Sequence, residues 1–161
     1  MKMKTYAEQL QAIVTRYIES GEPWPASTHE IAAWAIRTRK WEPPHSSMVD
    51  MCADQLARAM REEYITDSQG RRVRCKHAAR VKRHGQQITL WADIRNADRR
   101  HMEVAFQQRR QQIVGDCAQL KRDVDSYNDN RSKANPIQMV FDFTQDLAEI
   151  EALARETPVA V

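Results

Sequence analysis

The chain has 161 residues, a length typical of one domain with some additional structure. Hydrophobic residues make up 42% of it and charged residues 29%, and the scarcity of glycine (4) and proline (6) argues against a loop-rich β-sandwich. No apolar run approaches the roughly 18–20 residues that cross a bilayer, the N-terminus lacks the apolar block of a secretory signal, and the cysteines are widely spaced, so we expect a cytoplasmic protein with reduced thiols.

The net charge of +3 is distributed unevenly. Residues 140–161 contain five acids and one arginine, a local charge of −4, which leaves +7 for the rest of the chain. The stretch RRVRCKHAARVKRHG, residues 71–85, carries seven lysines and arginines, and no acid occurs between Asp67 and Asp93. This asymmetry predicts a surface that faces a polyanion, together with an acidic tail. The alternative is a basic hairpin that is simply solvated.

Helical periodicity predicts three helices before residue 64. TYAEQLQAIVTRYIESG repeats apolar residues at intervals of three and four, and Thr5 with Glu8 forms a capping box. STHEIAAWAI opens with a second capping box, Ser27 with Glu30. The prolines of EPPHSS interrupt the chain before a third helix, SSMVDMCADQLARAMREEY. Its predicted buried stripe consists of Val49, Cys52, Ala53, Leu56 and Met60.

The pattern then changes to that of strands. EYITDSQGRRVRC predicts a strand, a four-residue turn and a second strand. In the second strand Val73 and Cys75 alternate with Arg72, Arg74 and Lys76, which gives an apolar core face and a cationic face. QQITLWADI predicts a further strand, and the intervening HAARVKRHG is expected to be a mobile basic loop.

Helical periodicity returns over residues 96–128 as an approximate heptad. The seam consists of Met102, Phe106, Ile113, Cys117, Leu120, Val124 and Tyr127, with Arg110 among them. Two copies could pair through this seam as a homodimer, or the seam could pack against the first or last helix of its own chain. After the polar segment NDNRSKANP, a last amphipathic helix is expected to begin with Asn135 as its cap and Pro136 at its first position.

The order of these elements resembles that of the winged helix-turn-helix superfamily over residues 5–92. STHEIAAWAI corresponds to the supporting helix, SSMVDMCADQLARAM to the recognition helix and EYITDSQGRRVRC to the wing. We therefore expect a mainly α fold with a small β-hairpin or sheet (α+β). Its parts would be a winged-helix domain over 5–95, a long helix for possible dimerisation over 96–128, and a polar linker with an acidic amphipathic segment over 129–161.

The resemblance implies that the recognition helix enters the major groove of double-stranded DNA and that the wing follows the phosphates. The residues expected at phosphates are Arg71, Arg72, Arg74, Lys76, Arg80, Lys82 and Arg83, with Arg37, Arg39 and Lys40 as a second backbone contact. Those expected nearest to bases are Ser46, Ser47, Asp50 and Met51. Asp50 and Asp54 are unfavourable beside phosphate, although an aspartate can accept a hydrogen bond from cytosine. Trp41, beside Arg39 and Lys40, is a candidate for stacking against a sugar or base.

The sequence predicts no catalytic residue, metal or cofactor. HEIAA begins like the zinc-protease motif HExxH but has Ala33 in place of the second histidine. Cys75, His77, His84 and Cys52 lack the paired spacing of a structural zinc site, and no glycine-rich phosphate loop occurs. The most favoured function is a non-catalytic DNA-binding regulator of transcription or replication that acts as a dimer. The alternatives are a protein–protein adaptor built on a winged-helix domain and an RNA-binding protein that uses the same basic surface.

Overall fold

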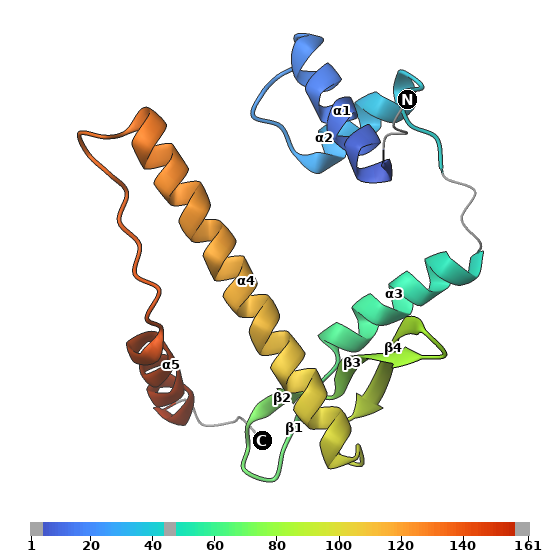
Figure 1. Cartoon of the computed structure of the whole chain (residues 1–161), viewed down its shortest axis with the longest axis vertical. Coiled ribbons are helices and arrows are strands. Elements are labelled where there is room, and N and C mark those ends of the chain that lie inside the picture. The colour runs from blue at the N-terminus through green and yellow to red at the C-terminus, as the bar shows by residue number, and fades with distance from the viewer. Residues whose placement is uncertain (1–4, 44–47, 157–161) are drawn as a thin grey trace. The chain divides into compact units, whose positions relative to one another are not determined.

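The computed structural model describes residues 5–43 and 48–156 (Figure 1). Within them the helices and strands are α1 (Tyr6–Glu19), α2 (Thr28–Arg37), α3 (Met48–Glu62), β1 (Tyr64–Thr66), β2 (Arg72–Arg74), β3 (Lys76–Arg83), β4 (Gln86–Asp93), α4 (Arg99–Arg131) and α5 (Thr144–Glu156). The strands form two small antiparallel sheets, β1–β2 and β3–β4. The predicted mainly α fold with a small β part is confirmed. None of the helices described here is both long enough and apolar enough to span a membrane.

The polypeptide forms two compact units, residues 1–51 and 52–161, and each is described by itself. In the first unit, α1 and α2 begin at the two predicted capping boxes. The Thr5 N–H donates to the Glu8 carboxylate at 2.7 Å, and the Ser27 N–H donates to that of Glu30 at 2.7 Å. The helices enclose a small core of Ile13, Tyr17, Trp34 and Ala35. This unit is therefore a helix pair closed by aromatic and aliphatic packing.

Helix α3 is amphipathic, but none of its described residues is buried. Val49 is 74% exposed and Leu56 is 56% exposed, so the predicted buried stripe is wrong for this helix. The reason is that no described element of the second unit packs extensively against α3, which leads directly into β1. The periodicity of the sequence predicted the helix correctly, but it could not predict whether another element packs against the apolar face.

The β3–β4 hairpin is the larger of the two sheets and pairs Lys76 with Asp93 at one end and Arg83 with Gln86 at the other. His84 and Gly85 connect its strands with φ values of 48° and 77°, as a two-residue type I′ turn requires. The basic segment expected to be a mobile loop is therefore strand β3. Its inward and outward positions do alternate, with His77 and Ala79 buried, but alanines and cationic side chains conceal this in the sequence.

Strands β2 and β3 form one extended run that changes its partner at Cys75. The Cys75 N–H donates to the Glu63 carbonyl at 2.9 Å, which continues the ladder with β1. The Cys75 carbonyl accepts from the Ile94 N–H at 2.9 Å, which continues the ladder with β4. One residue thus links the two hairpins through its backbone.

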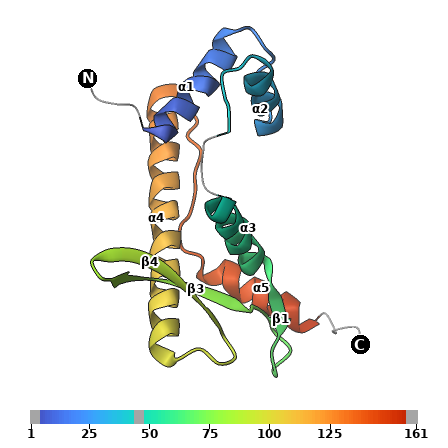
Figure 2. The same cartoon turned by 90° about the vertical axis from the view of Figure 1, so that its right-hand side faces the viewer.

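Helix α4 confirms the long helix expected over 96–128 and lies against β3, where Phe106 contacts the His77 ring with centroids 5.2 Å apart. The segment after α4 runs back alongside it before α5 begins (Figures 1 and 2). The predicted helix start at Asn135 is wrong, because residues 136–143 are not helical. The Asn128 side chain instead holds the Ile137 backbone N–H and carbonyl, both at 2.8 Å, and the Asp142 carboxylate accepts from the Thr144 N–H at the start of α5.

Candidate nucleic-acid interface

A cavity of about 660 Å³ lies in the second unit, where the end of α3, the two hairpins and α4 meet. Five cationic side chains line it: Arg61, Arg74, Lys76, Arg80 and Arg109. No aspartate or glutamate of the described chain belongs to this lining. The remaining wall consists of His77, Ala78, Thr89, Trp91, Ala105, Gln108, Gln111 and Gln112. Several positive charges without an acid in one concave surface produce a strongly positive local potential.

Gln108 fixes helix α4 against the edge of β3. Its side-chain carbonyl accepts from the Arg80 N–H at 2.8 Å, and its amide donates to the Arg80 carbonyl at 2.8 Å. The side chain therefore replaces one rung of a β-ladder on the edge that faces away from β4. Because Arg109 follows Gln108 directly, Arg80 and Arg109 are positioned together in the cavity wall.

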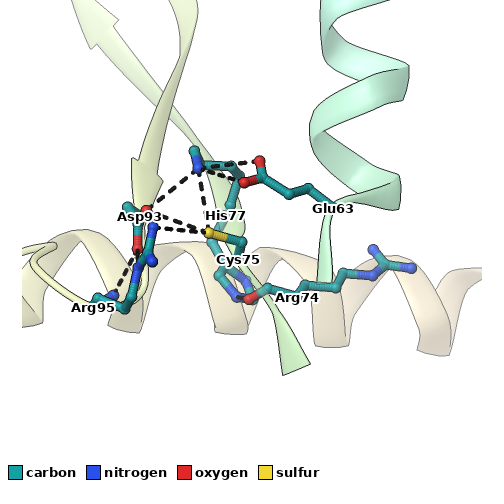
Figure 3. Close-up of polar contacts among 7 residues, drawn as sticks. Glu63, Arg74, Cys75, His77, Asp93 and Arg95 are labelled. Carbon is teal, nitrogen blue, oxygen red and sulfur yellow. Dashed lines mark hydrogen bonds and ion pairs between the residues drawn. The ribbon is translucent and has the colours of Figure 1, made fainter. Parts of the chain in front are cut away.

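Lys76 lies in a charged cluster with Glu63, Asp93 and Arg95 (Figure 3). Its ammonium group is 3.1 Å from the Glu63 carboxylate and 3.3 Å from that of Asp93. The Arg95 guanidinium holds both Asp93 oxygens, at 2.9 and 2.6 Å. Hydrogen bonds from Arg95 lower the pKa of Asp93 far below its usual range, and the carboxylate of Glu63 raises the pKa of Lys76. The charge of Lys76 is thus already paired with carboxylates, in contrast to the charges of the four arginines in the cavity lining.

Cys75 is fully buried within this cluster, as expected from its place on the inward face of the strand. Its surroundings are not apolar, however. The thiol donates to the Asp93 carboxylate at 3.3 Å, and the Lys76 ammonium donates to the sulfur at 3.3 Å (Figure 3). Burial raises the pKa of the thiol, so the neutral form is favoured. A buried protonated thiol is a structural group and a poor nucleophile.

The first hairpin brings further arginines to the same region. The Arg72 guanidinium lies over the Tyr64 ring, 3.9 Å from its centroid. A hydrogen bond from Arg74 lowers the pKa of the Tyr64 hydroxyl, and the positive charges of Arg72 and Arg109 lower it further. Arginines of β2 and α4 thus act together on one tyrosine of β1.

His77 lines the cavity, and its surroundings favour the neutral form of its ring. Burial lowers its pKa, and the positive charges of Arg109 and Arg74 act in the same direction. Its Nε2–H donates to the Arg74 carbonyl at 3.0 Å, while His101 donates to the His77 carbonyl at 2.9 Å. The two histidines thus connect the hairpins with α4 through hydrogen bonds to backbone carbonyls.

Of the seven predicted phosphate-binding residues of the hairpins, Arg72 and Arg74 lie beside Tyr64, and the other five fall into two groups. Arg71 is paired with Asp67 at 2.7 Å, and Lys76 is paired as described. Arg80, Lys82 and Arg83 are exposed on β3 or partly so, and no carboxylate of the described residues lies within ion-pair distance of them. The second group is therefore the more available for an external anion.

Two cavity arginines were not identified from the sequence. Arg61 lies near the end of α3, where its guanidinium is 5.5 Å from the Trp91 ring centroid, and Arg109 lies in the first half of α4. Both sit in helical segments whose local charge is unremarkable. Only the fold brings them to the hairpins, so no local signal in the sequence could have singled them out.

The other predicted DNA contacts belong to the first unit. Arg37 is 3.6 Å from Glu22, while Arg39 and Lys40 are exposed after α2, and Asp50 and Met51 are exposed in the first turn of α3. Ser46 and Ser47 lie outside the described residues. Trp41 packs against the core of this unit and donates its indole N–H to the Tyr6 hydroxyl at 3.1 Å, which gives it a role in the fold. A surface shared by these residues and the hairpins remains a prediction.

A second, apolar groove of about 850 Å³ lies along α4. Its apolar lining consists of Phe106, Ile113, Val114, Cys117, Ala118, Phe141, Phe143 and Leu147. The segment after α4 therefore covers part of the predicted seam. Ile113 is still 51% exposed and Tyr127 is 51% exposed, so much of the seam remains about half exposed.

No family model, curated protein or solved structure matches the chain. The described residues also contain no group of three or more His, Cys, Asp or Glu side chains placed to hold a metal ion. Function must therefore be inferred from the chain's own geometry, of which the cationic cavity and the exposed side of β3 are the most distinctive parts.

Proposed function

We propose that this chain is a non-catalytic, cytoplasmic DNA-binding regulator that contacts phosphates through the cavity and strand β3. The observation that carries the proposal is the convergence of Arg61, Arg74, Arg80 and Arg109 on one concave surface whose described lining contains no acid. Like charges gathered in this way repel one another, and a polyanion removes that repulsion while releasing its own counterions.

The availability of each cation decides its role. Arg80 and Lys82 lie on one face of β3 and extend the positive surface from the cavity along the strand, whereas Arg83 lies on the other face beside the turn; all three are assigned to phosphates. Arg72 and Arg74 supplement them beside Tyr64. Lys76 and Arg71 are assigned to positioning, because carboxylates already neutralise them.

The winged-helix resemblance supplies the rest of this proposal. Helix α3 would act as the recognition helix, with Asp50 and Met51 near bases and Arg37, Arg39 and Lys40 at the backbone. A dimer formed through 96–128 would present two half-sites, and exposed seam residues such as Ile113 and Tyr127 support this arrangement.

Salt-dependent binding tests the proposal. We expect a labelled DNA duplex to bind at low salt and Arg80→Gln/Lys82→Gln/Arg83→Gln to reduce the slope of log K against log salt by up to roughly 2.7, about 0.9 for each phosphate that the variant no longer neutralises. The matched control is Arg122→Gln/Arg131→Gln/Arg155→Gln, which removes the same charge from α4 and α5. Equal affinities and slopes for the two triple variants would show that the proposal is wrong.

The adaptor alternative is favoured by the apolar groove along α4, because exposed apolar patches mark protein interfaces. It predicts no duplex binding at low salt and loss of partner binding or self-association in Ile113→Asp. The RNA alternative would be preferred if hairpin RNA bound much more tightly than duplex DNA at the same ionic strength.

A further inference from the structure

The cationic cavity also has an aromatic wall. Trp91 lies on β4, is only partly buried and lines the cavity, and the Arg61 guanidinium lies over its ring at 5.5 Å. The guanidinium and the indole together form a flat surface, and an aromatic ring stacks favourably on the side of this pair that faces the cavity, because both groups attract π-systems. A polyanion without aromatic rings would contact only the charged side chains of the cavity. Trp91 therefore indicates a ligand that also has an aromatic ring.

A third wall consists of neutral amides. Gln111 and Gln112 follow Gln108 by one turn of α4 and line the same cavity, whereas Gln108 is occupied by the β3 backbone. A glutamine side chain offers both a donor and an acceptor, which are the groups that pair with the edge of a nucleobase. Cations, an aromatic face and amides therefore meet in one concave, solvent-accessible space.

The size and shape of the cavity limit what can enter. Its volume of about 660 Å³ falls within the roughly 300–1,000 Å³ range of small-ligand pockets. A base within a duplex is stacked on both faces and cannot reach a concave pocket, whereas an unpaired base can leave the stack. We propose that the cavity binds one unpaired nucleotide of a nucleic-acid strand, with the base against Trp91 and the phosphate against Arg74, Arg80 and Arg109. This inference rests on the proposed nucleic-acid binding and specifies its substrate.

The surroundings favour a strand over a free nucleotide. Lys82 continues the positive surface of β3 beyond the cavity lining, and Arg83 adds a charge beside the turn from the opposite face of the strand, both without carboxylate partners among the described residues. A mononucleotide inside the cavity would leave those charges unused, whereas the phosphates that flank an unpaired nucleotide in a strand would reach them.

Binding of matched probes to the full chain tests the inference. We expect a duplex with an unpaired single-stranded tail to bind roughly 10-fold more tightly than the same duplex with blunt ends, since one base–aromatic stack contributes about that much. Trp91→Leu should remove this preference, because it weakens binding of the tailed duplex roughly 10-fold and binding of the blunt duplex much less, and Trp91→Phe should retain most of it. Trp24→Leu is the matched control, because Trp24 is 53% exposed and lies in the first unit.

The outcomes separate the two proposals. If neither probe binds, the proposed function fails and the inference fails with it. If both probes bind equally and Trp91→Leu changes neither affinity, nucleic-acid binding stands but the nucleotide pocket is wrong. If a free mononucleotide displaces the tailed probe at concentrations near the probe's own Kd, the assignment to a strand is wrong. A melting temperature for Trp91→Leu close to that of Trp91→Phe shows that the lost preference does not arise from unfolding.

Discussion

The first unit packs aromatic and aliphatic side chains into a small core, whereas the second unit arranges much of its interior around charges. Tyr17 meets Trp34 edge to face at 5.5 Å in the first unit, and no ionised side chain of the described residues shares that core. In the second, the fully buried Cys75 lies among Lys76, Asp93 and Arg95. The ion pairs of Lys76 and Arg95 hold the hairpins together and neutralise the carboxylates of Glu63 and Asp93. The arginines that line the cavity therefore remain available for an anionic ligand.

The largest effect is expected from emptying the core of the first unit. Trp34→Ala should cost about 3–5 kcal/mol of unfolding free energy, since a large buried ring leaves a cavity behind. Hydrogen exchange should show lost protection over α1 and α2, with protection in β3 and β4 retained. The control Trp24→Ala changes an exposed ring. Lost protection in both units would contradict their independence.

A smaller, pH-dependent effect is expected in the second unit from Asp93→Asn. Because Arg95 lowers the pKa of Asp93 in the folded state, the unfolded chain binds more protons at this group in acid. Its stabilising contribution is therefore present above about pH 4, the usual pKa of an aspartate, and is lost as the pH falls below that value. Thermal unfolding between about pH 2 and 7 should show a weaker acid dependence in the variant. If the melting temperature falls equally with decreasing pH in both proteins, the ion pair of Asp93 with Arg95 does not make this contribution to stability.

The smallest effect is expected where α4 meets β3. Gln108→Ala removes two hydrogen bonds to the Arg80 backbone and should cost about 1–2 kcal/mol. The neighbouring Gln107 is exposed, so Gln107→Ala is the matched control. Amide exchange at Arg80 should accelerate only in the first variant. Equal exchange in the two would show that the bridge does not hold the cavity wall.

Local signals in the sequence were sufficient for much of the fold. The capping boxes at Thr5 and Ser27 fixed the starts of α1 and α2, because each satisfies the free N–H groups of a helix with neighbouring residues. Strand β3 was not predicted from the sequence. Arg80 and Lys82 occupy its outward positions, and the inward position between them and His77 holds only the small Ala79, so the usual alternation of large apolar and polar residues is weak. At Asn135 the sequence resembles a helix cap, but the side chain of Asn128 binds the following backbone instead.

The candidate site was only half visible in the sequence. The hairpin cations are contiguous along the chain, so sequence alone is enough to recognise them as a cluster. Arg61, Trp91 and Arg109 come from three separate elements and meet only after folding. The division of cations into paired and available ones likewise depends on tertiary packing, as Lys76 shows by its two carboxylate partners.

The exchange of partners at Cys75 sets a limit on how the length of this chain can vary. A single inserted or deleted residue between 72 and 83 would reverse the faces of one hairpin relative to the other, because side chains alternate along a strand. Arg80 and Lys82 would then turn towards α4, and His77 and Ala79 would turn towards solvent. The turns at 67–70 and 84–85 are free of that constraint, so related sequences should differ in length there and keep the spacing from Arg72 to Arg83 constant.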